Sequence, residues 1–308
     1  MIEFIKADTK YDFVAKFGLT SIISVLLVIG SVVAILGKMN YGVDFRGGAE
    51  VQIKNETAVN LNQLRSTLKK QGFSGVQVQT LGETDQFEYL IKVPGSEANL
   101  NEVTQKVKVS LKKEFPGVDI RKIDIVGPKA GAALRISGFQ AMAWAMIAIM
   151  VYIGLRFDFK YSPGAIFALF HDVSIILGIF ALTGTEFTLQ TVAALLAVIG
   201  YSVNDTVIVY DRVREHEEKA VEVELGTHIN TAINETLSRT ILTSGTTLFI
   251  SLSMFFFGGL AIRDFFMAIS LGVLIGTYSS IFVAAPVTLF FDRLKKGSNA
   301  KSTQAIKA

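Results

Sequence analysis

The amino-acid sequence predicts an α-helical membrane protein with six transmembrane helices and one polar α+β domain outside the membrane. Half of its 308 residues are hydrophobic and 19% are charged, whereas an ordinary soluble domain carries about a quarter charged residues. Six stretches are close to the roughly 20 apolar residues that cross the hydrocarbon core as a helix. Residues 38–133 hold 25 of the 57 acidic and basic side chains, so this block is the predicted polar domain.

The six apolar stretches divide the chain into its predicted parts. The first, residues 17–37, is followed by no A-x-A cleavage site, so we interpret it as a transmembrane helix rather than a signal peptide. The other five lie within residues 134–292, at 136–155, 163–183, 188–210, 241–258 and 265–291. The last is long enough to bend, and Pro286 is the expected kink because proline lacks a backbone N–H.

Lysine and arginine in the short loops predict the orientation of the chain. Basic residues precede the first helix and follow the second, fourth and sixth, whereas the alternate loops hold almost none. Loops rich in basic residues stay on the cytoplasmic side. The predicted cytoplasmic parts are the two tails, residues 1–16 and 293–308, and the helical connector 211–238. Residues 38–133 are then expected on the opposite side.

Within residues 38–133 the hydrophobic pattern changes between strand and helix periodicity. Alternation predicts strands at 50–54, 76–81, 87–93 and 118–126, and helical spacing predicts helices at 61–70 and 100–115. The resulting order is βαββαβ, the ferredoxin-like or split βαβ arrangement. Its carboxylates are dispersed and it has no histidine, so we interpret it as a docking or binding domain rather than a catalytic one.

Several function classes lack their signatures in this sequence. There is no cysteine and the three histidines are scattered, so no metal site is predicted. No G-x-x-x-x-G-K-[ST], G-x-S-x-G or H-E-x-x-H motif occurs, so we expect neither an enzyme nor a bound cofactor. A net charge of +3 without a basic, aromatic-rich run argues against nucleic acid as a partner. If the protein performs work, ion flow is the expected source of energy.

Asp205 is the strongest candidate for ion-coupled chemistry. A carboxylate at membrane depth costs about 2.5–3.5 kcal/mol on insertion scales, so its presence requires a reason. Arg239 opens the next membrane helix, and the hydroxyls of Thr243 and Thr246 lie within about 40° of its direction. Antiparallel packing would bring Asp205 and Arg239 to similar depth, which favours a proton or ion pathway. The alternatives are a buried ion pair that only fixes helix register and an arginine that snorkels to the interface.

Other predicted helices also carry polar or small residues. His171 and Asp172 fall near the middle of the third helix, where a helix-packing hydrogen bond and a proton relay are both open interpretations. Asn204 is about 100° from Asp205 around its helix and is expected to face a different neighbour. Gly272-x-x-x-Gly276 in the last helix predicts close helix packing.

Segments distributed over the chain form recognisable motifs. Tyr41-Gly-Val-Asp-Phe-Arg-Gly-Gly48 follows the first helix, Val126-Gly-Pro128 precedes the second, and Phe170-His-Asp-Val173 lies in the third. The most specific are AVIGYSVNDTVIVYDR at residues 197–212 and Leu237-Ser-Arg-Thr240. Over nearly its whole length the chain resembles the SecF family. These proteins are the smaller membrane subunits of the bacterial SecD–SecF protein-export complex, within the resistance-nodulation-division superfamily.

The resemblance implies a function and assigns residues to it. The family uses the proton motive force to help pull unfolded secretory proteins through the Sec channel across the bacterial inner membrane, with its outer domain in the periplasm. Asp205 matches the essential intramembrane aspartate, Arg239 its partner arginine, and Thr243 the threonine of the same proton pathway. The implied partners are SecD, which would add a further aspartate, the Sec channel, the translocating protein and membrane lipid. Protons are the implied coupling ion, without any cofactor.

A mechanism based on this resemblance adds further candidate residues. The outer domain would move through its two tethers, near residues 41–48 and 126–135, whose glycines are expected to act as hinges. The hinge and tether candidates are Gly42, Asp44, Gly47, Gly48, Gly127 and Pro128. Asn204, Asp172 and His171 are additional candidates for the proton pathway.

Two other functions stay open on the sequence. A proton-coupled small-molecule transporter of the same superfamily would have a substrate vestibule and would transport by itself. A passive scaffold for the translocation channel would tolerate neutralisation of both Asp205 and Arg239. An aspartate surrounded by hydroxyls also suits either protons or sodium as the coupling ion.

Overall fold

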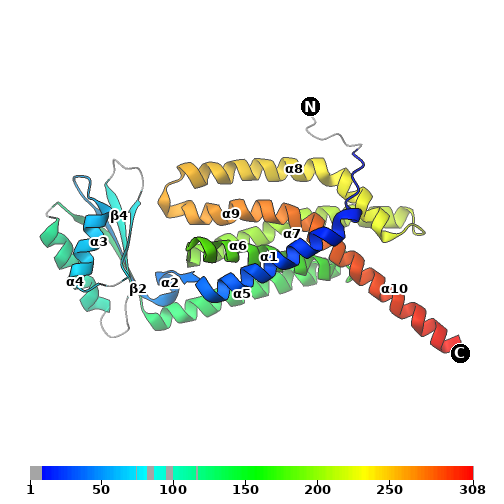
Figure 1. Cartoon of the computed structure of the whole chain (residues 1–308), viewed down its shortest axis with the longest axis horizontal. Helices are drawn as coiled ribbons and strands as arrows, with labels where there is room; N and C mark the ends of the chain where they lie inside the picture. Colours follow the sequence, from blue (N-terminus) through cyan, green and yellow to red (C-terminus); the bar gives the residue numbers. More distant parts are fainter. Residues whose placement is uncertain (1–8, 74, 82–86, 95–99, 116, 308) are drawn as a thin grey trace.

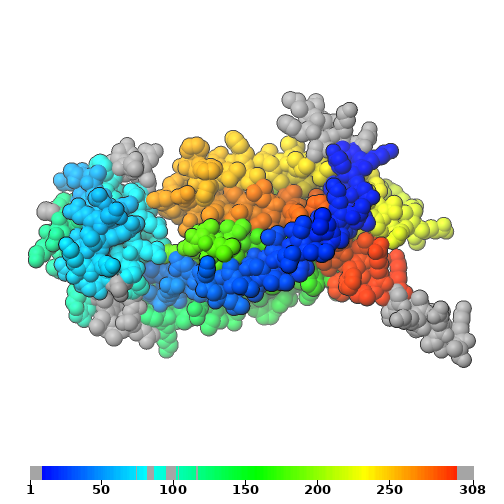
Figure 2. Space-filling view, in the orientation of Figure 1, coloured from blue at the N-terminus to red at the C-terminus, as the bar shows by residue number. Residues whose placement is uncertain are grey.

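The structure, a computed structural model, describes residues 9–73, 75–81, 87–94, 100–115 and 117–307. In this part of the chain six helices are long and apolar enough to cross a membrane, which confirms the predicted number. They form an elongated bundle, and a small sheet domain lies at one of its ends (Figure 1 and Figure 2). Residues 1–8 of the predicted N-terminal tail lie outside the described residues.

The membrane helices follow the predicted apolar stretches. A 3₁₀ turn, Val14–Lys16, leads into α1 (Phe17–Lys38), and α5 (Pro128–Arg156) and α6 (Ser162–Thr183) come next in the bundle. α7 (Leu189–Lys219) and α8 (Leu225–Phe257) are long, and their ends far from the sheet domain form most of the predicted connector 211–238. The sixth span consists of α9 (Leu260–Ser279), a π-helical segment (Ser280–Ala284) and the first part of α10 (Ala285–Lys307).

The sixth span changes its helical geometry just before Pro286. The π-helical segment ends at Ala284, and α10 leaves the bundle at an angle (Figure 1). Proline offers no N–H to the carbonyl four residues earlier, and a π-bulge is one way in which a helix accommodates this loss. The buried hydroxyl of Tyr210 in α7 donates a hydrogen bond to the carbonyl oxygen of Ala284, 3.3 Å away.

α6 and α7 lie in the interior of the bundle. About two thirds of the apolar part of α6 (67%) and half of that of α7 and of the sixth span (50% each) are buried, against 17% for α1, α5 and α8. Small residues bring the helices close together: a Cβ added to Gly178 of α6 would lie 2.5 Å from the Cβ of Ser31 in α1. The exposed outer faces of α1, α5 and α8 are correspondingly the surfaces available to lipid or to another protein.

The sheet domain has the element order that the alternating pattern predicts. Its elements are β2 (Gly48–Lys54), α3 (Leu61–Lys70), β3 (Gln77–Leu81), β4 (Glu88–Pro94), α4 (Leu100–Glu114) and β5 (Asp119–Val126). The strands pair antiparallel in the order β3-β4-β2-β5. Val51, Ile53 and Ile91 of the central strands are fully buried with Leu64 of α3 and Leu111 of α4. One face of the sheet is therefore covered by the two helices, as Figure 1 shows.

A small junction, which the sequence pattern did not reveal, connects the sheet domain to the bundle. β1 (Asn40–Tyr41) pairs in parallel with β6 (Glu186–Phe187), which lies in the loop between α6 and α7. A one-turn helix, α2 (Val43–Arg46), follows β1. Two-residue strands carry no measurable periodicity, so this pairing is visible only in the structure.

The Gly47-Gly48 pair lets the chain pass close to the start of α5. Gly47 has φ 82° and Gly48 has φ 150°, a region that favours glycine. A Cβ on Gly47 would lie 2.7 Å from the backbone of Pro128, and one on Gly48 would lie 2.4 Å from the carbonyl oxygen of Val93. A larger residue at Gly47 would therefore separate this turn from α5, and one at Gly48 would disturb the pairing of β2 with β4.

Candidate functional site

Two buried carboxylates in the bundle contact α7. Asp205 belongs to this helix, and Asp172 of α6 reaches it through Ser202. Each aspartate is only 1% exposed. Ser202 and Asp205 are three residues apart on α7, so the two polar sites occupy adjoining parts of one helix. A change in the charge or hydrogen bonding of either carboxylate therefore acts on α7.

Asp205 has an incomplete set of hydrogen-bond partners. Its Oδ2 accepts one long bond, 3.4 Å, from the hydroxyl of Ser244 in α8, and its Oδ1 is buried without a partner. The Ser244 hydroxyl also lies 2.7 Å from Thr277 Oγ1 of α9 and accepts a bond from the Tyr201 hydroxyl at 3.4 Å. A buried carboxylate with an open oxygen is costly when ionised, so it is suited to bind a proton or an ordered water.

Arg239 and Thr243 do not touch Asp205 in this structure. No carboxylate of the described residues lies within 4.0 Å of the guanidinium of Arg239. The Thr243 hydroxyl bonds to its own helix, at the carbonyls of Arg239 and Thr240, 3.0 and 3.1 Å away. The expected direct ion pair between Asp205 and Arg239 is therefore absent from this arrangement of α7 and α8.

α8 carries two hydroxyl stripes, and the second one faces its neighbours. Ser244 contacts Asp205, and Ser251 accepts a hydrogen bond from the Ser270 hydroxyl of α9 at 2.9 Å. Ser244 and Ser251 are spaced by two helical turns, like the stripe that includes Arg239. Helical spacing alone fits both stripes, so only the packing of α8 identifies Ser244 as the group that meets Asp205.

The first stripe forms part of an exposed polar surface. Arg239 and Thr246 of α8 are exposed, and so is Asn204 on α7. Gly200 and Gly245 on the same two helices have no atom within 4 Å of an added Cβ, apart from their own helices. Lipid offers no hydrogen-bond partner to polar side chains, and small residues allow two helices to approach closely. A surface that has both is therefore typical of contact with another helix.

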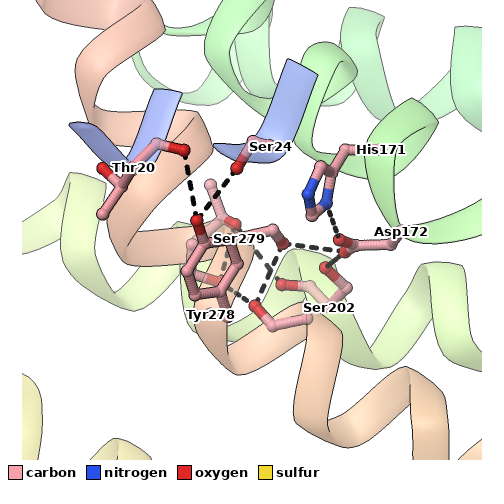
Figure 3. A network of polar contacts seen from close by, with 10 residues as sticks. Thr20, Ser24, His171, Asp172, Ser202, Tyr278 and Ser279 are labelled. Atoms are coloured by element: carbon pink, nitrogen blue, oxygen red, sulfur yellow. Dashed lines mark hydrogen bonds and ion pairs between the residues drawn. The ribbon is translucent and has the colours of Figure 1, made fainter. Parts of the chain in front are cut away.

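Asp172 is better satisfied than Asp205 and joins three helices (Figure 3). Its Oδ2 accepts hydrogen bonds from Ser202 of α7 at 2.6 Å and from Ser279 of α9 at 2.8 Å. Its Oδ1 lies 3.0 Å from Nδ1 of His171, the preceding residue on α6. The predicted helix-packing role therefore has direct partners, although the sequence did not identify the two serines.

His171 extends this network to α1. Its ring stacks on Tyr278 of α9 with 5.9 Å between the ring centroids, and the Tyr278 hydroxyl lies 3.0 Å from Ser24 Oγ of α1 (Figure 3). The second ring nitrogen of His171, Nε2, is buried and has no hydrogen-bond partner.

The predicted close packing at Gly272 and Gly276 is confirmed. A Cβ on Gly272 of α9 would lie 2.2 Å from a methyl group of Val198 in α7, and one on Gly276 would lie 3.1 Å from the Cβ of Ser202. The glycines thus allow the backbone of α9 to pack directly against α7. This approach places Thr277 and Ser279 beside the two aspartate sites.

Comparison with known proteins decides the family. The family model described as "Protein export membrane protein SecD/SecF, C-terminal" matches residues 106–294, and the "SecD/SecF GG Motif" model matches residues 37–59. A protein translocase subunit SecF from Rickettsia typhi is 39% identical over 295 residues, 95% of this chain and 96% of the relative. One from Calditerrivibrio nitroreducens is 38% identical over 301 residues, 96% of this chain and 98% of the relative.

The chain belongs to the SecF family. Among solved structures it is similar to SecDF from Thermus thermophilus, titled a translocon-associated membrane protein, with TM-score 0.81 and 32% identity. A SecDF structure described as the super-membrane-facing form gives TM-score 0.71 and 29% identity. The chain covers 93% and 97% of its own length in these matches but only 39% and 41% of the SecDF chains. SecDF is thus the longer protein, and the SecF relatives are named protein translocase subunits.

The GG motif of the SecF family coincides with the junction. It includes Gly47, which packs against Pro128 at the start of α5, Gly48 at the start of β2, and Asp44, whose Oδ2 accepts a hydrogen bond from the backbone N–H of Leu189 at 2.9 Å. Gly42 donates its N–H to the carbonyl of Phe187 at 2.9 Å. Gly42 and Asp44 of the first tether therefore contact the loop before α7 and the first residue of that helix. In the second tether, Gly127 immediately precedes α5 and Pro128 is its first residue.

Proposed function

We propose that the chain is a subunit of a SecD–SecF complex that uses the proton motive force to assist protein export through the Sec channel. It would lie in the bacterial inner membrane, with both termini in the cytoplasm and the sheet domain in the periplasm. The family and the SecDF-like architecture support a role in export. The distribution of lysine and arginine between alternate loops supports the orientation.

Asp205 carries the proposal because it is the buried acid whose hydrogen bonding is incomplete. Its open Oδ1 and long bond to Ser244 leave it poorly stabilised as an anion. Asp172, in contrast, has three neighbouring groups positioned to donate hydrogen bonds. We therefore assign proton uptake and release to Asp205, while His171 and Asp172 hold the helices around it.

Arg239, Thr243 and Asn204 would act at the interface with SecD. Arg239 and Asn204 are exposed next to the helix face that carries Asp205. An arginine at this depth requires an anionic or polar counterpart, which a SecD carboxylate would supply. Movement of α8 relative to α7 would then exchange the partner of Arg239 between this chain and SecD.

The working cycle follows from the charge of Asp205. When it is ionised it attracts Arg239, and when a proton from the periplasm neutralises it that attraction ends and α7 and α8 are free to rearrange. One proton crossing 100 mV supplies about 2.3 kcal/mol, which biases a two-state movement by roughly fiftyfold. Release of the proton to the cytoplasm restores the starting arrangement.

Export into energised membrane vesicles tests this function. Asp205→Asn keeps the size of the side chain but cannot carry the proton, so we expect the proton-dependent part of export to fall at least about tenfold. Asp211→Asn is the matched control, because Asp211 lies on the same helix with a side chain that is 45% exposed. Undiminished proton-dependent export by Asp205→Asn would contradict the proposed function.

A further inference from the structure

The sheet domain meets the membrane bundle beside an acidic cavity of about 360 Å³. Its lining includes Asp44, Glu50 and Asp124 from the sheet-domain side and Asp264 at the start of α9. Lys92 of β4 and Lys122 of β5 are the basic residues in this lining. The cavity therefore has more carboxylates than cations, and Lys92 lies at the point where the two parts of the molecule touch.

Lys92 makes an ion pair across the boundary between the two parts. Its Nζ lies 2.5 Å from Oε2 of Glu186, which belongs to β6 in the loop before α7. The side chains are 11% and 10% exposed, so solvent screens this pair only weakly. Among the ion pairs of the described residues, it alone joins the sheet domain to the bundle. A second carboxylate, Glu50, lies 3.6 Å from the same ammonium.

The position of this pair connects the sheet domain to the helix that carries Asp205. Glu186 precedes the first residue of α7 by three positions, and its strand β6 is paired with β1. Asp44 accepts a hydrogen bond from the first N–H of α7. A shift of α7 along its axis would therefore act on Lys92 of the sheet domain through Glu186, and on the first tether through Asp44.

We propose that Lys92 and Glu186 form a clasp that docks the sheet domain onto the loop before α7, and that this clasp opens and closes during the working cycle. It provides a direct mechanical connection between the membrane helices and the sheet domain. The glycines of the two tethers then allow the domain to move once the clasp has opened. The opening and closing rest on the proposed function, whereas the docked contact itself does not depend on which ion drives the cycle.

The groups around the clasp make its strength depend on the pH of the outer solution. Burial raises the pKa of Glu50 above its ordinary value of 4.5, and the charges of Asp44 and Glu186 add to this rise against the opposing effect of Lys92. Burial alone would lower the pKa of Lys92, but Glu186, Glu50 and Asp264 raise it, so Lys92 stays charged. A raised pKa at Glu50 means that the docked state binds the proton more tightly than an undocked one. Docking is then strongest at acidic pH and weakens as the pH rises through the titration of Glu50.

Distances between spin labels test the clasp directly. The chain has no cysteine, so Val109→Cys on α4 and Leu182→Cys on α6 provide two exposed attachment sites without background. In the complex in lipid bilayers we expect one main distance between the labels. Lys92→Glu should lower the ratio of docked to undocked molecules at least about tenfold, because the new carboxylate would face those of Glu186 and Glu50. Glu186→Gln, outside the sheet domain, should shift the ratio in the same direction.

Control variants separate the clasp from general damage to the domain. The exchange Lys92→Glu with Glu186→Lys should restore most of the docked distance. Lys54→Glu, which disrupts a pair with Glu88 inside the same sheet, should leave the distance unchanged. Glu50→Gln should remove the dependence of the docked fraction on pH. An unchanged distance distribution in Lys92→Glu, or no recovery in the exchanged pair, would overturn the proposal, whatever the result of the export test with Asp205→Asn.

Discussion

Replacing Asp172 with leucine is expected to destabilise the helical bundle by about 1–3 kcal/mol, because two hydrogen bonds between helices are lost. The substitution leaves Ser202 of α7 and Ser279 of α9 without their shared acceptor, and a hydrogen bond between membrane helices contributes about 0.6 kcal/mol on average and up to about 1.7 kcal/mol. His171 of the same helix also loses its partner. The loss falls on the contacts that hold α6, α7 and α9 together. The free energy of unfolding, measured by denaturant titration in mixed micelles, checks this expectation.

Two control variants should be measured beside Asp172→Leu. Asp172→Asn retains an acceptor oxygen of the same size, so its loss of stability should be clearly smaller than that of Asp172→Leu. Asp158→Leu replaces an exposed aspartate in the turn between α5 and α6 and should be close to neutral. A cost below 1 kcal/mol for Asp172→Leu would mean that the network of Figure 3 does not hold the helices together.

Gly272→Ala is expected to have the second large effect, by pushing α9 away from α7. The new Cβ would lie 2.2 and 2.5 Å from the two methyl groups of Val198, so one of the helices must shift. Overpacking of this kind costs about 1–3 kcal/mol. The shift also moves Thr277 away from Ser244, so that both stability and proton-dependent export should fall.

The same glycine has a matched control and a suppressor in this chain. Gly245→Ala in α8 places its Cβ in open space, so in the isolated chain it should be neutral or stabilising by up to about 1 kcal/mol, since alanine favours the helix. Val198→Ala removes the two methyl groups and should recover part of the loss when combined with Gly272→Ala. Equal stabilities of Gly272→Ala and Gly245→Ala would show that the close approach of α7 and α9 is unimportant.

Much of the fold could be predicted because it depends on long patterns. Six apolar stretches predict six helices, since each must satisfy its backbone within the bilayer. The strands of the sheet domain alternate because one face packs against helices, as Ile53 and Ile91 do. The pairing of β1 with β6 could not be predicted, because two strands of two residues depend on the way the whole bundle brings residues 40 and 186 together.

The site was only partly predictable for a related reason. Asp205 and Asp172 could be identified because a carboxylate is rare within an apolar helix. Their partners could not, because Ser202, Ser244 and Ser279 are ordinary residues of membrane helices until packing brings them to a carboxylate. The angle between Arg239 and Ser244 on α8, about 140°, decides which one meets Asp205, and it depends on the rotation of α8 against α7.

Infrared difference spectroscopy of the complex in lipid tests most directly whether Asp205 takes up the coupling proton. Lowering the pH should produce the C=O stretching bands of protonated carboxylic acids, and one component of these bands should be missing in Asp205→Asn but present in Asp172→Asn and in Glu50→Gln. Adding sodium at constant pH should leave it unchanged. A spectrum in which Asp205→Asn retains the full pH-dependent band, or in which sodium replaces the proton, would contradict the account.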